Sequence, residues 1–444
     1  MALSLERVVF FLEDMGKEKS RNFKFILQAA LASFGAYFCM YAFRKPFTVA
    51  TFKDLNFWGI DYKILLIIAQ VLGYTLSKFL GIKIIAELKS SKRMFLLILF
   101  ILISELALLG FAMVPLPYNM AFLFLNGLPL GMIWGIVFSY LEGRKTTEIL
   151  GVILCSSFIV SSGVVKSIGK YTMDTFGVSE FWMPFVTGLY FIIPLIVFAL
   201  LLEKLPAPTE EDKLNRTARK PLSNRERIKL YKELALPLTI IIVFYVFLTG
   251  IRDFRDNFAR EIWDTLGYTN DASIYSFSEI PIAICVLIIM AFIGTIANNF
   301  KAFMYYHIAL LFGSFAIAIS TFLFQIHIVN PVVWMIVSGF GMYLCYIPFQ
   351  GLYFDRMIAT FKIKGNVGFL IYIADAFGYL GSVLILLYKN LGESNVSYLN
   401  FFIILIYIIS AIGIFVALLS YLFFQKKKNT TPIIPSMTYA ENSM

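Results

Sequence analysis

The residues of this sequence that could do chemistry are ionisable side chains within long apolar stretches. A charge inside a bilayer is costly unless it faces a polar cavity or an opposite charge, so each such residue marks a candidate site. The first half of the chain holds four and the second half six: Arg44, Lys78, Glu105 and Lys166, then Arg252, Asp253, Arg255, Asp256, Glu279 and Asp375.

The arginines favour an anion-binding site. Arg44 lies at the end of the first long apolar stretch, and Arg252 and Arg255 lie in the seventh. A guanidinium can bind phosphate or carboxylate through two parallel hydrogen bonds, which lysine cannot do. We therefore predict an anion clamp built from both halves of the chain. In the alternative, nearby carboxylates neutralise the second-half arginines, and Arg44 extends outward to the membrane surface.

The other charges allow several roles. Lys78, in YTLSKF, needs a cavity or a carboxylate, and Glu105 is a possible partner; a structural pair and a substrate contact both remain open. Glu279 and Asp375 could take up a proton and couple transport to a proton gradient, because burial raises a carboxyl pKa, or each could be a fixed counter-charge. We expect Lys166 to extend toward the outer surface.

Other residue types give weaker signals. Tyr37 and Tyr41 could hydrogen-bond a ligand, with packing as the alternative. The sequence has no GxxxxGK[ST] phosphate loop, and neither of its two histidines has a zinc-ligand neighbour four residues on. The four cysteines show no paired spacing. We predict a protein that is not an enzyme and uses no cofactor and no metal.

The elements that position these residues are membrane-spanning helices. Of the 444 residues, 59% are apolar and 15% charged, which argues against a water-soluble fold. A spanning helix needs about 20 mostly apolar residues. Twelve stretches qualify: 24–44, 62–82, 94–114, 119–141, 149–170, 181–202, 235–258, 273–297, 302–325, 331–353, 367–388 and 399–424. The predicted fold class is therefore an all-α membrane protein.

The distribution of basic residues predicts the orientation. With the N-terminus in the cytoplasm, 27 of the 38 Lys and Arg residues fall in cytoplasmic segments and about five in external loops. Both termini are then cytoplasmic in a multi-pass protein of the bacterial inner membrane. The net charge of +10 suits an anionic leaflet and requires no nucleic acid. We expect a monomer whose partners are the lipid bilayer and a small anionic substrate.

A polar stretch divides the chain into two sets of six spans. The predicted domains are a cytoplasmic N-terminal lead (1–23), a first six-helix bundle (24–202), a cytoplasmic linker (203–234), a second six-helix bundle (235–424) and a disordered cytoplasmic tail (425–444).

The two halves resemble each other. AFRKPF at 42–47 and DFRDNF at 253–258 share Phe-Arg-x-x-Phe, which pairs Arg44 with Arg255. GMIWGIVFSYLEGR at 131–144 and GMYLCYIPFQGLYFDR at 341–356 both close in Tyr, an acid and Arg. Parallel repeats of six spans are typical of transporters of the major facilitator superfamily, to which we assign the fold.

Three segments resemble one branch of that superfamily, the organophosphate:phosphate antiporters, which include the bacterial glycerol-3-phosphate and hexose-phosphate transporters. They are FGAYFCMYAFRKPF at 34–47, LGYTLSKFLG at 72–81 and VFLTGIRDF at 246–254. The resemblance implies that Arg44 and Arg252 contact the phosphate and that Lys78 assists. It thus names Arg252 where the internal repeat names Arg255, one helical turn away.

The chain also departs from that branch. GVILCSSFIVSSG at 151–163 lacks the family's span-five histidine, and LEGRKTTEILG replaces its span-four-to-five loop. We therefore expect a divergent bacterial family. The predicted function is a secondary transporter of a small anionic solute, an organophosphate or another anion, coupled to phosphate exchange or to protons. The alternative is a transporter-like receptor that binds an anion without moving it.

Overall fold

The structure is a computed structural model. It describes residues 24–86, 88–142, 144, 146–207, 224–350, 352–361, 367–392 and 396–430. The predicted lead over 1–23 lies outside the described residues, as do the centre of the predicted linker and the end of the predicted tail. The predictions of cytoplasmic disorder and location for these segments therefore stay predictions.

Helices make up both halves of the chain. The first half contains a helix over residues 24–41, the 3₁₀ turns η1 (Pro46–Val49) and η2 (Ser90–Lys92), the short strands β1 (Asn56–Phe57) and β2 (Ile60–Asp61), and α2 (Tyr62–Ala86), α3 (Arg93–Met113), α4 (Met120–Leu141), α5 (Thr147–Phe176) and α6 (Met183–Glu203). The second half contains α8 (Asn224–Asn257), α9 (Ala259–Thr265), α10 (Ile274–Gly294), α11 (Asn299–Gln325), α12 (Pro331–Tyr346), η3 (Ile347–Gln350), α13 (Leu352–Phe361), α14 (Val367–Leu391) and α15 (Tyr398–Thr430).

Each of the twelve predicted spans coincides with a helix of the structure. Among the described residues, nine helices are long and apolar enough to cross a membrane. The helix over 24–41, α8 and α14 are not among those nine, and α8 ends in four charged residues between positions 252 and 256. The prediction of an all-α membrane fold is confirmed.

Two predicted spans end earlier as regular helix than the hydrophobic pattern suggests. The first stops at residue 41, where the N–H groups of Ala42, Phe43 and Arg44 bond three residues back in a tighter turn. In the tenth span the α-helix ends at Tyr346, and the chain goes on in the 3₁₀ turn η3, which contains Pro348. Proline has no N–H to continue the helical ladder, and a hydrophobicity scan does not detect this.

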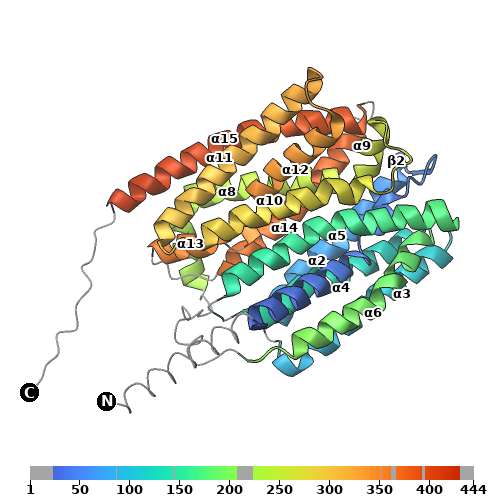
Figure 1. Ribbon diagram of the computed structural model, residues 1–444, viewed down its shortest axis with the longest axis horizontal. Helices are drawn as coiled ribbons and strands as arrows, with labels where there is room; N and C mark the ends of the chain where they lie inside the picture. Colours follow the sequence, from blue (N-terminus) through green and yellow to red (C-terminus); the bar gives the residue numbers. More distant parts are fainter. Residues whose placement is uncertain are drawn as a thin grey trace, which may run out of the picture.

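The helices form two bundles that meet along two helix pairs. In Figure 1 the bundle of α2 to α6 lies below the bundle of α8 to α15. Helix α5 packs against α10, and α2 packs against α14, so each bundle contributes two helices to the contact. The turn η1 also touches α8 and α9 across the same contact. Any side chain on the inner faces of these helices lies between the bundles.

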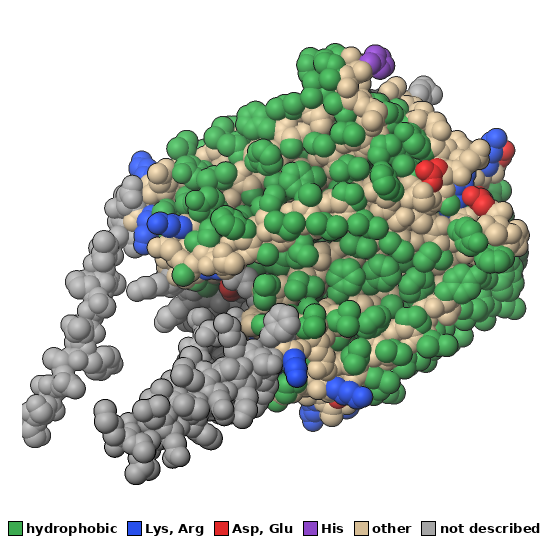
Figure 2. Space-filling view, viewed as in Figure 1, with side chains coloured by type: hydrophobic (Ala, Val, Ile, Leu, Met, Phe, Trp, Pro, Cys, Tyr) green, Lys and Arg blue, Asp and Glu red, His purple; other side chains and the backbone are tan. Residues whose placement is uncertain are grey.

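The two ends of the molecule differ. We call the end that holds η1, β1, β2 and α9 the hairpin end, and the opposite end, which holds α13, the α13 end (Figure 1). Figure 2 shows apolar side chains across the middle of the visible face and charged side chains at both ends. Ile193, Phe292 and Leu422 are among the large apolar side chains that are exposed. A broad apolar belt between charged ends is the surface that a bilayer requires.

Candidate functional site

A small cavity lies between the two bundles. It is enclosed, with a volume of about 10 Å³, which is room for about one water molecule. Both halves of the chain line it: Tyr41, Arg44, Lys45, Phe158 and Ser162 from the first, and Arg252, Asp253, Asp256 and Tyr343 from the second. We call this space the central cavity. It contains three of the residues that the sequence singled out for substrate binding.

Arg44 reaches the central cavity from the turn that follows the helix over 24–41. Its side chain is buried, with 4% of the residue exposed. The guanidinium carbon lies 3.9 Å from the ring centre of Tyr74 and 5.9 Å from that of Tyr41. No carboxylate of the described residues lies within ion-pairing distance of Arg44, and its Nε has no hydrogen-bond partner there. A buried cation without a counter-charge is a costly arrangement unless an anion binds to it.

Two buried amides hold the backbone of this turn. Gln70 on α2 donates a hydrogen bond to the carbonyl oxygen of Arg44 at 3.0 Å and another to the side chain of Asn126 at 2.8 Å. Asn126 on α4 donates to the carbonyl oxygen of Phe43 at 2.9 Å. The sequence analysis missed both residues, although a buried Gln and Asn in apolar spans are a signal of polar contacts. They satisfy carbonyl groups that a broken helix leaves open.

Arg252 enters the central cavity from α8 in the other half. Its guanidinium bonds the neighbouring Asp253 at 2.6 Å and lies 4.3 Å from the ring centre of Tyr346. Asp253 receives both hydrogen bonds on Oδ1, and its Oδ2 has no partner among the described residues. The alternative from the sequence, in which nearby carboxylates neutralise the second-half arginines, fits this pair of Arg252 with Asp253. The same alternative has Arg44 extending outward to the membrane surface, whereas Arg44 is buried.

Two residues at matching positions of the internal repeat, Lys45 and Asp256, contact each other. These residues follow Arg44 and Arg255 in the two repeated motifs, and their side chains form an ion pair across the halves. Lys166 on α5 forms a second ion pair with Asp256. The prediction that Lys166 extends to the outer surface is wrong, because only 2% of the residue is exposed and its ammonium group meets a buried carboxylate.

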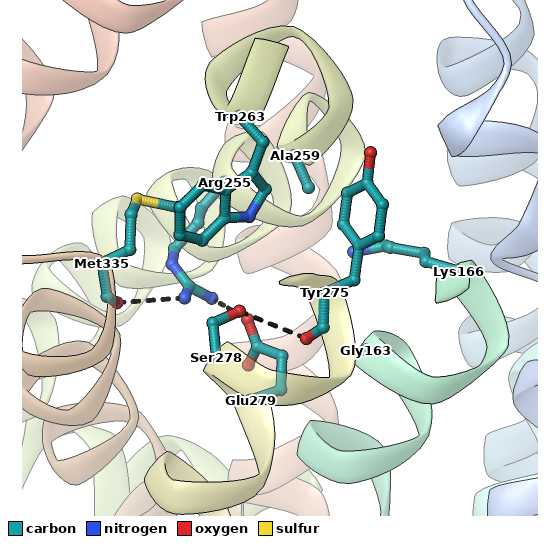
Figure 3. Close-up of a pocket in the computed structure, with 9 residues that line it drawn as sticks. All are labelled: Gly163, Lys166, Arg255, Ala259, Trp263, Tyr275, Ser278, Glu279 and Met335. Atoms are coloured by element: carbon teal, nitrogen blue, oxygen red, sulfur yellow. Dashed lines mark hydrogen bonds and ion pairs between the residues drawn. The ribbon is translucent and has the colours of Figure 1, made fainter. Parts of the chain in front are cut away.

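Arg255 lies in a different cavity. Figure 3 shows its guanidinium between Glu279 and the backbone of Met335, and the bonds measure 2.5 and 3.2 Å. Gly163 and Lys166 reach the same cavity from α5. The sequence left open whether Arg252 or Arg255 accompanies Arg44. Arg252 shares the central cavity with Arg44, whereas Arg255 lies one turn further along α8 and is bound to Glu279.

Lys78 pairs across the halves and not within its own bundle. Its ammonium nitrogen lies 3.2 Å from the carboxylate of Asp375 on α14. Asp375 also accepts a hydrogen bond of 2.6 Å from Tyr245. Glu105, the partner suggested by the sequence, lies on α3 where α3 packs against α6, and a Cβ on Gly188 would overlap its carboxylate. The sequence order of the charges could not reveal this pairing.

The tyrosines divide between the cavity and the packing around it. Tyr41 lines the central cavity, whereas Tyr37 packs edge-on against Tyr41 at 5.7 Å between ring centres and does not line it. Tyr74 and Tyr379 meet across the halves at 4.9 Å between ring centres. Tyrosines therefore surround the arginines with polarisable rings and hydroxyl groups.

The hairpin end is closed by a further contact between the halves. Lys63, at the start of α2, lies 2.5 Å from Glu261 on α9 and donates to the carbonyl oxygen of Thr48 at 2.7 Å. Burial raises the pKa of the Glu261 carboxyl above its usual value, and Lys63 acts in the opposite direction. Glu180 accepts hydrogen bonds from the N–H groups of Thr51 and Phe52, which ties the hairpin segment to the first half.

Solved structures of transporters have the same fold. A D-xylose-proton symporter matches with a TM-score of 0.61 and 13% identity, over 90% of this chain and 97% of that chain. The nucleoside transporter NupG matches with a TM-score of 0.56 and 16% identity, over 90% and 99%. Tetrameric PepTSo2 matches with a TM-score of 0.57 and 13% identity, over 91% and 99%. At such low identity the likeness concerns the fold alone.

Comparisons of sequence add the family. No curated protein matches the chain. The sequence model of one family, described as a family of unknown function, matches residues 46–427. The match covers most of the chain, from η1 to the last turn of α15. The chain therefore belongs to the DUF5690 family.

Proposed function

We propose that this protein is a secondary transporter that moves a small anionic solute across the bacterial inner membrane by alternating access. One observation carries the proposal: Arg44 and Arg252, one from each half, line one enclosed cavity between the bundles. A site shared by two bundles of a transporter fold is where rocking of the bundles exposes a ligand to either side in turn.

The charges around the central cavity favour an anion. Three cationic side chains line it, Arg44, Lys45 and Arg252, against the two carboxylates of Asp253 and Asp256. Asp253 is engaged by Arg252, and Asp256 by lysines. An anion bound at Arg44 would supply the missing counter-charge. A phosphate or carboxylate would accept two parallel hydrogen bonds from the guanidinium, the bidentate geometry that both groups favour.

Binding of the anion also explains how the halves would close on their substrate. Arg44 and Arg252 carry like charges from opposite halves, so an anion between them replaces repulsion by attraction. The phosphate of an organophosphate fits this requirement, in line with the resemblance of the Arg44, Lys78 and Arg252 segments to the organophosphate:phosphate antiporters. The proposal has two forms. Transport is coupled to phosphate exchange in one, and to protons carried by Asp375 or Glu279 in the other.

Counterflow in proteoliposomes tests the proposal. Vesicles are loaded with inorganic phosphate, and uptake of labelled glycerol 3-phosphate and glucose 6-phosphate is followed. We expect exchange in the natural protein and a loss of about tenfold or more in Arg44→Lys, because lysine keeps the charge but not the bidentate contact. The matched control is Arg93→Lys, at the start of α3 on the α13 end, which should leave exchange unchanged.

The outcomes separate the possible functions. Normal exchange in Arg44→Lys would contradict the arginine site. Uptake that requires a proton gradient in place of internal phosphate would select proton coupling, and Asp375→Asn and Glu279→Gln would then identify the carboxylate. Binding of these anions without any movement across the vesicle membrane would contradict transport and favour the receptor.

A further inference from the structure

Two residues that line the central cavity each have a buried polar atom without a hydrogen-bond partner among the described residues, and the two atoms have opposite character. The Nε of Arg44 is a hydrogen-bond donor on a cation, and the Oδ2 of Asp253 is an acceptor on an anion. Both residues line the same cavity, with 4% and 2% of their surfaces exposed. Buried polar atoms are nearly always satisfied in folded proteins, so two unsatisfied atoms on residues that line one cavity call for an explanation.

A purely anionic ligand would satisfy only one of these atoms. It would bond Arg44 but leave Oδ2 of Asp253 without a donor, and it would place a second negative charge in the same small space. An unsatisfied buried acceptor is costly, and like charges at short range in a poorly solvated site repel each other. A ligand that also carries a cationic donor would remove both costs.

We infer that the substrate carries an ammonium group as well as an anionic group, with the anionic group bound by Arg44 and the ammonium by Asp253. The inference rests on the proposed transport of an anion and narrows its substrate class. Because the cationic side chains of the cavity wall outnumber the carboxylates, the ligand has a net negative charge in spite of its ammonium group. Amino-substituted phosphate esters and acidic amino acids meet these conditions.

Arg252 is suited to hold Asp253 ready for this contact. It bonds Oδ1 through both Nε and a terminal nitrogen, at 3.1 and 2.6 Å, which fixes the carboxylate plane and leaves Oδ2 available. Arg252 thus acts as a positioning residue for Asp253 besides any contact of its own with the anion. Among the residues that the structure describes, Arg44 has no equivalent partner, which distinguishes the anion position from the ammonium position within the cavity.

Two pairs of probes test the inference, each matched except for the amine. Thermal unfolding of the detergent-purified protein is measured with increasing ethyl phosphate against phosphoethanolamine, and glutarate against glutamate. We expect the amine-bearing member of at least one pair to stabilise the natural protein at a concentration about tenfold lower or more. This preference should disappear in Asp253→Asn and persist in Asp54→Asn, an exposed control near β1.

The outcomes distinguish this inference from the proposed function. Arg44→Lys should weaken both members of a pair, because both rely on the anionic group. Equal stabilisation by the two members, or a preference for the member without the amine, overturns the ammonium site and leaves anion binding in place. No stabilisation of the natural protein by any of the four probes overturns both proposals. The comparison within the natural protein does not depend on whether a variant folds.

Discussion

At the scale of single residues, each charge buried between the halves has a defined environment. Three carboxylates, Asp253, Asp256 and Glu279, are bound to nearby cations at the centre and toward the hairpin end, while Arg44 has no such partner among the described residues. Ion pairs of this kind specify geometry more than they add stability, because desolvation offsets much of the attraction. The residue without a counter-charge is therefore the most informative one for function.

The Lys78–Asp375 pair gives a prediction about stability. In Asp375→Asn, Lys78 loses the carboxylate that lies 3.2 Å away, and we expect the free energy of unfolding to fall by about 3 kcal/mol or more. Adding Lys78→Met to Asp375→Asn removes the buried charge and should restore most of the loss. Unfolding in detergent, followed by circular dichroism, measures both. Additive losses in the double variant would show that the two side chains do not depend on each other.

The sequence identified the buried charges better than their partners. A charge within an apolar stretch can be recognised from the sequence alone, so Arg44, Lys78, Arg252 and Asp375 were all found. Their contacts depend on how two bundles approach each other, and no pattern within one helix encodes this. Lys78 therefore received Glu105 as its suggested partner, although its carboxylate comes from the other half of the chain.

At the scale of elements, close helix contacts depend on glycine. A Cβ on Gly127 of α4 would overlap the carbonyl oxygen of Gln70 on α2, and a Cβ on Gly73 of α2 would overlap that of Phe124 on α4. Each helix therefore brings a glycine against the backbone of the other. This contact also supports the amides of Gln70 and Asn126 that hold the Arg44 turn. The packing of α2 on α4 is thus connected to the geometry of the site.

Alanine substitutions test the role of these glycines. Gly127→Ala should lower the free energy of unfolding by about 1–3 kcal/mol, because backbone atoms of α2 must move away. Gly151→Ala is the control: its Cβ would lie 3.6 Å from the Phe138 ring, an ordinary contact, and alanine favours the helix by up to about 1 kcal/mol. Unfolding midpoints in detergent compare the two. A stabilised Gly127→Ala would show that α2 and α4 are packed less closely than described.

Helix positions were predicted well and helix ends less well. Length and hydropathy sufficed to place all twelve spans, since an apolar stretch of this length has few other structures available to it in a bilayer. The breaks at residues 42–45 and at η3 follow from tight turns and prolines within apolar sequence. These breaks place Arg44 in a turn, where its neighbours on α2 and α4 can bond its backbone.

At the scale of the whole molecule, the charge distribution predicts the orientation. Among the described residues, Lys301 lies at the start of α11, which packs against α13, and Lys427 lies over the ring of Phe361 at the end of α13. These basic residues are at the α13 end, so we expect the hairpin end to face away from the cytoplasm. In a variant without the natural cysteines, Lys53→Cys near β1 should react with a membrane-impermeant maleimide in intact cells. Lys301→Cys at the start of α11 should react only after the membrane is permeabilised. The reverse pattern would invert the proposed topology.

Two of the ion pairs between the halves toward the hairpin end share Asp256. It binds Lys45 and Lys166 from the first half, so its charge holds α8 against the turn after residue 41 and against α5. In Asp256→Asn the two lysines repel each other without a full counter-charge, and the halves should separate at this end more often. The structure therefore predicts a shift of the population toward an opening at the hairpin end.

Access to Ser278 measures this shift. Ser278 lines the cavity of Arg255 and is 1% exposed, so Ser278→Cys in a background without natural cysteines should react slowly with a membrane-impermeant maleimide. Asp256→Asn should raise that rate by about tenfold or more, which corresponds to a shift of about 1.4 kcal/mol between closed and open forms. Asp264→Asn, on α9 at the same end but bonded to Arg260, is the control. Equal rates in all three proteins would show that the Asp256 network does not hold the halves together, and the closure would then have to come from the apolar contacts of α5 with α10.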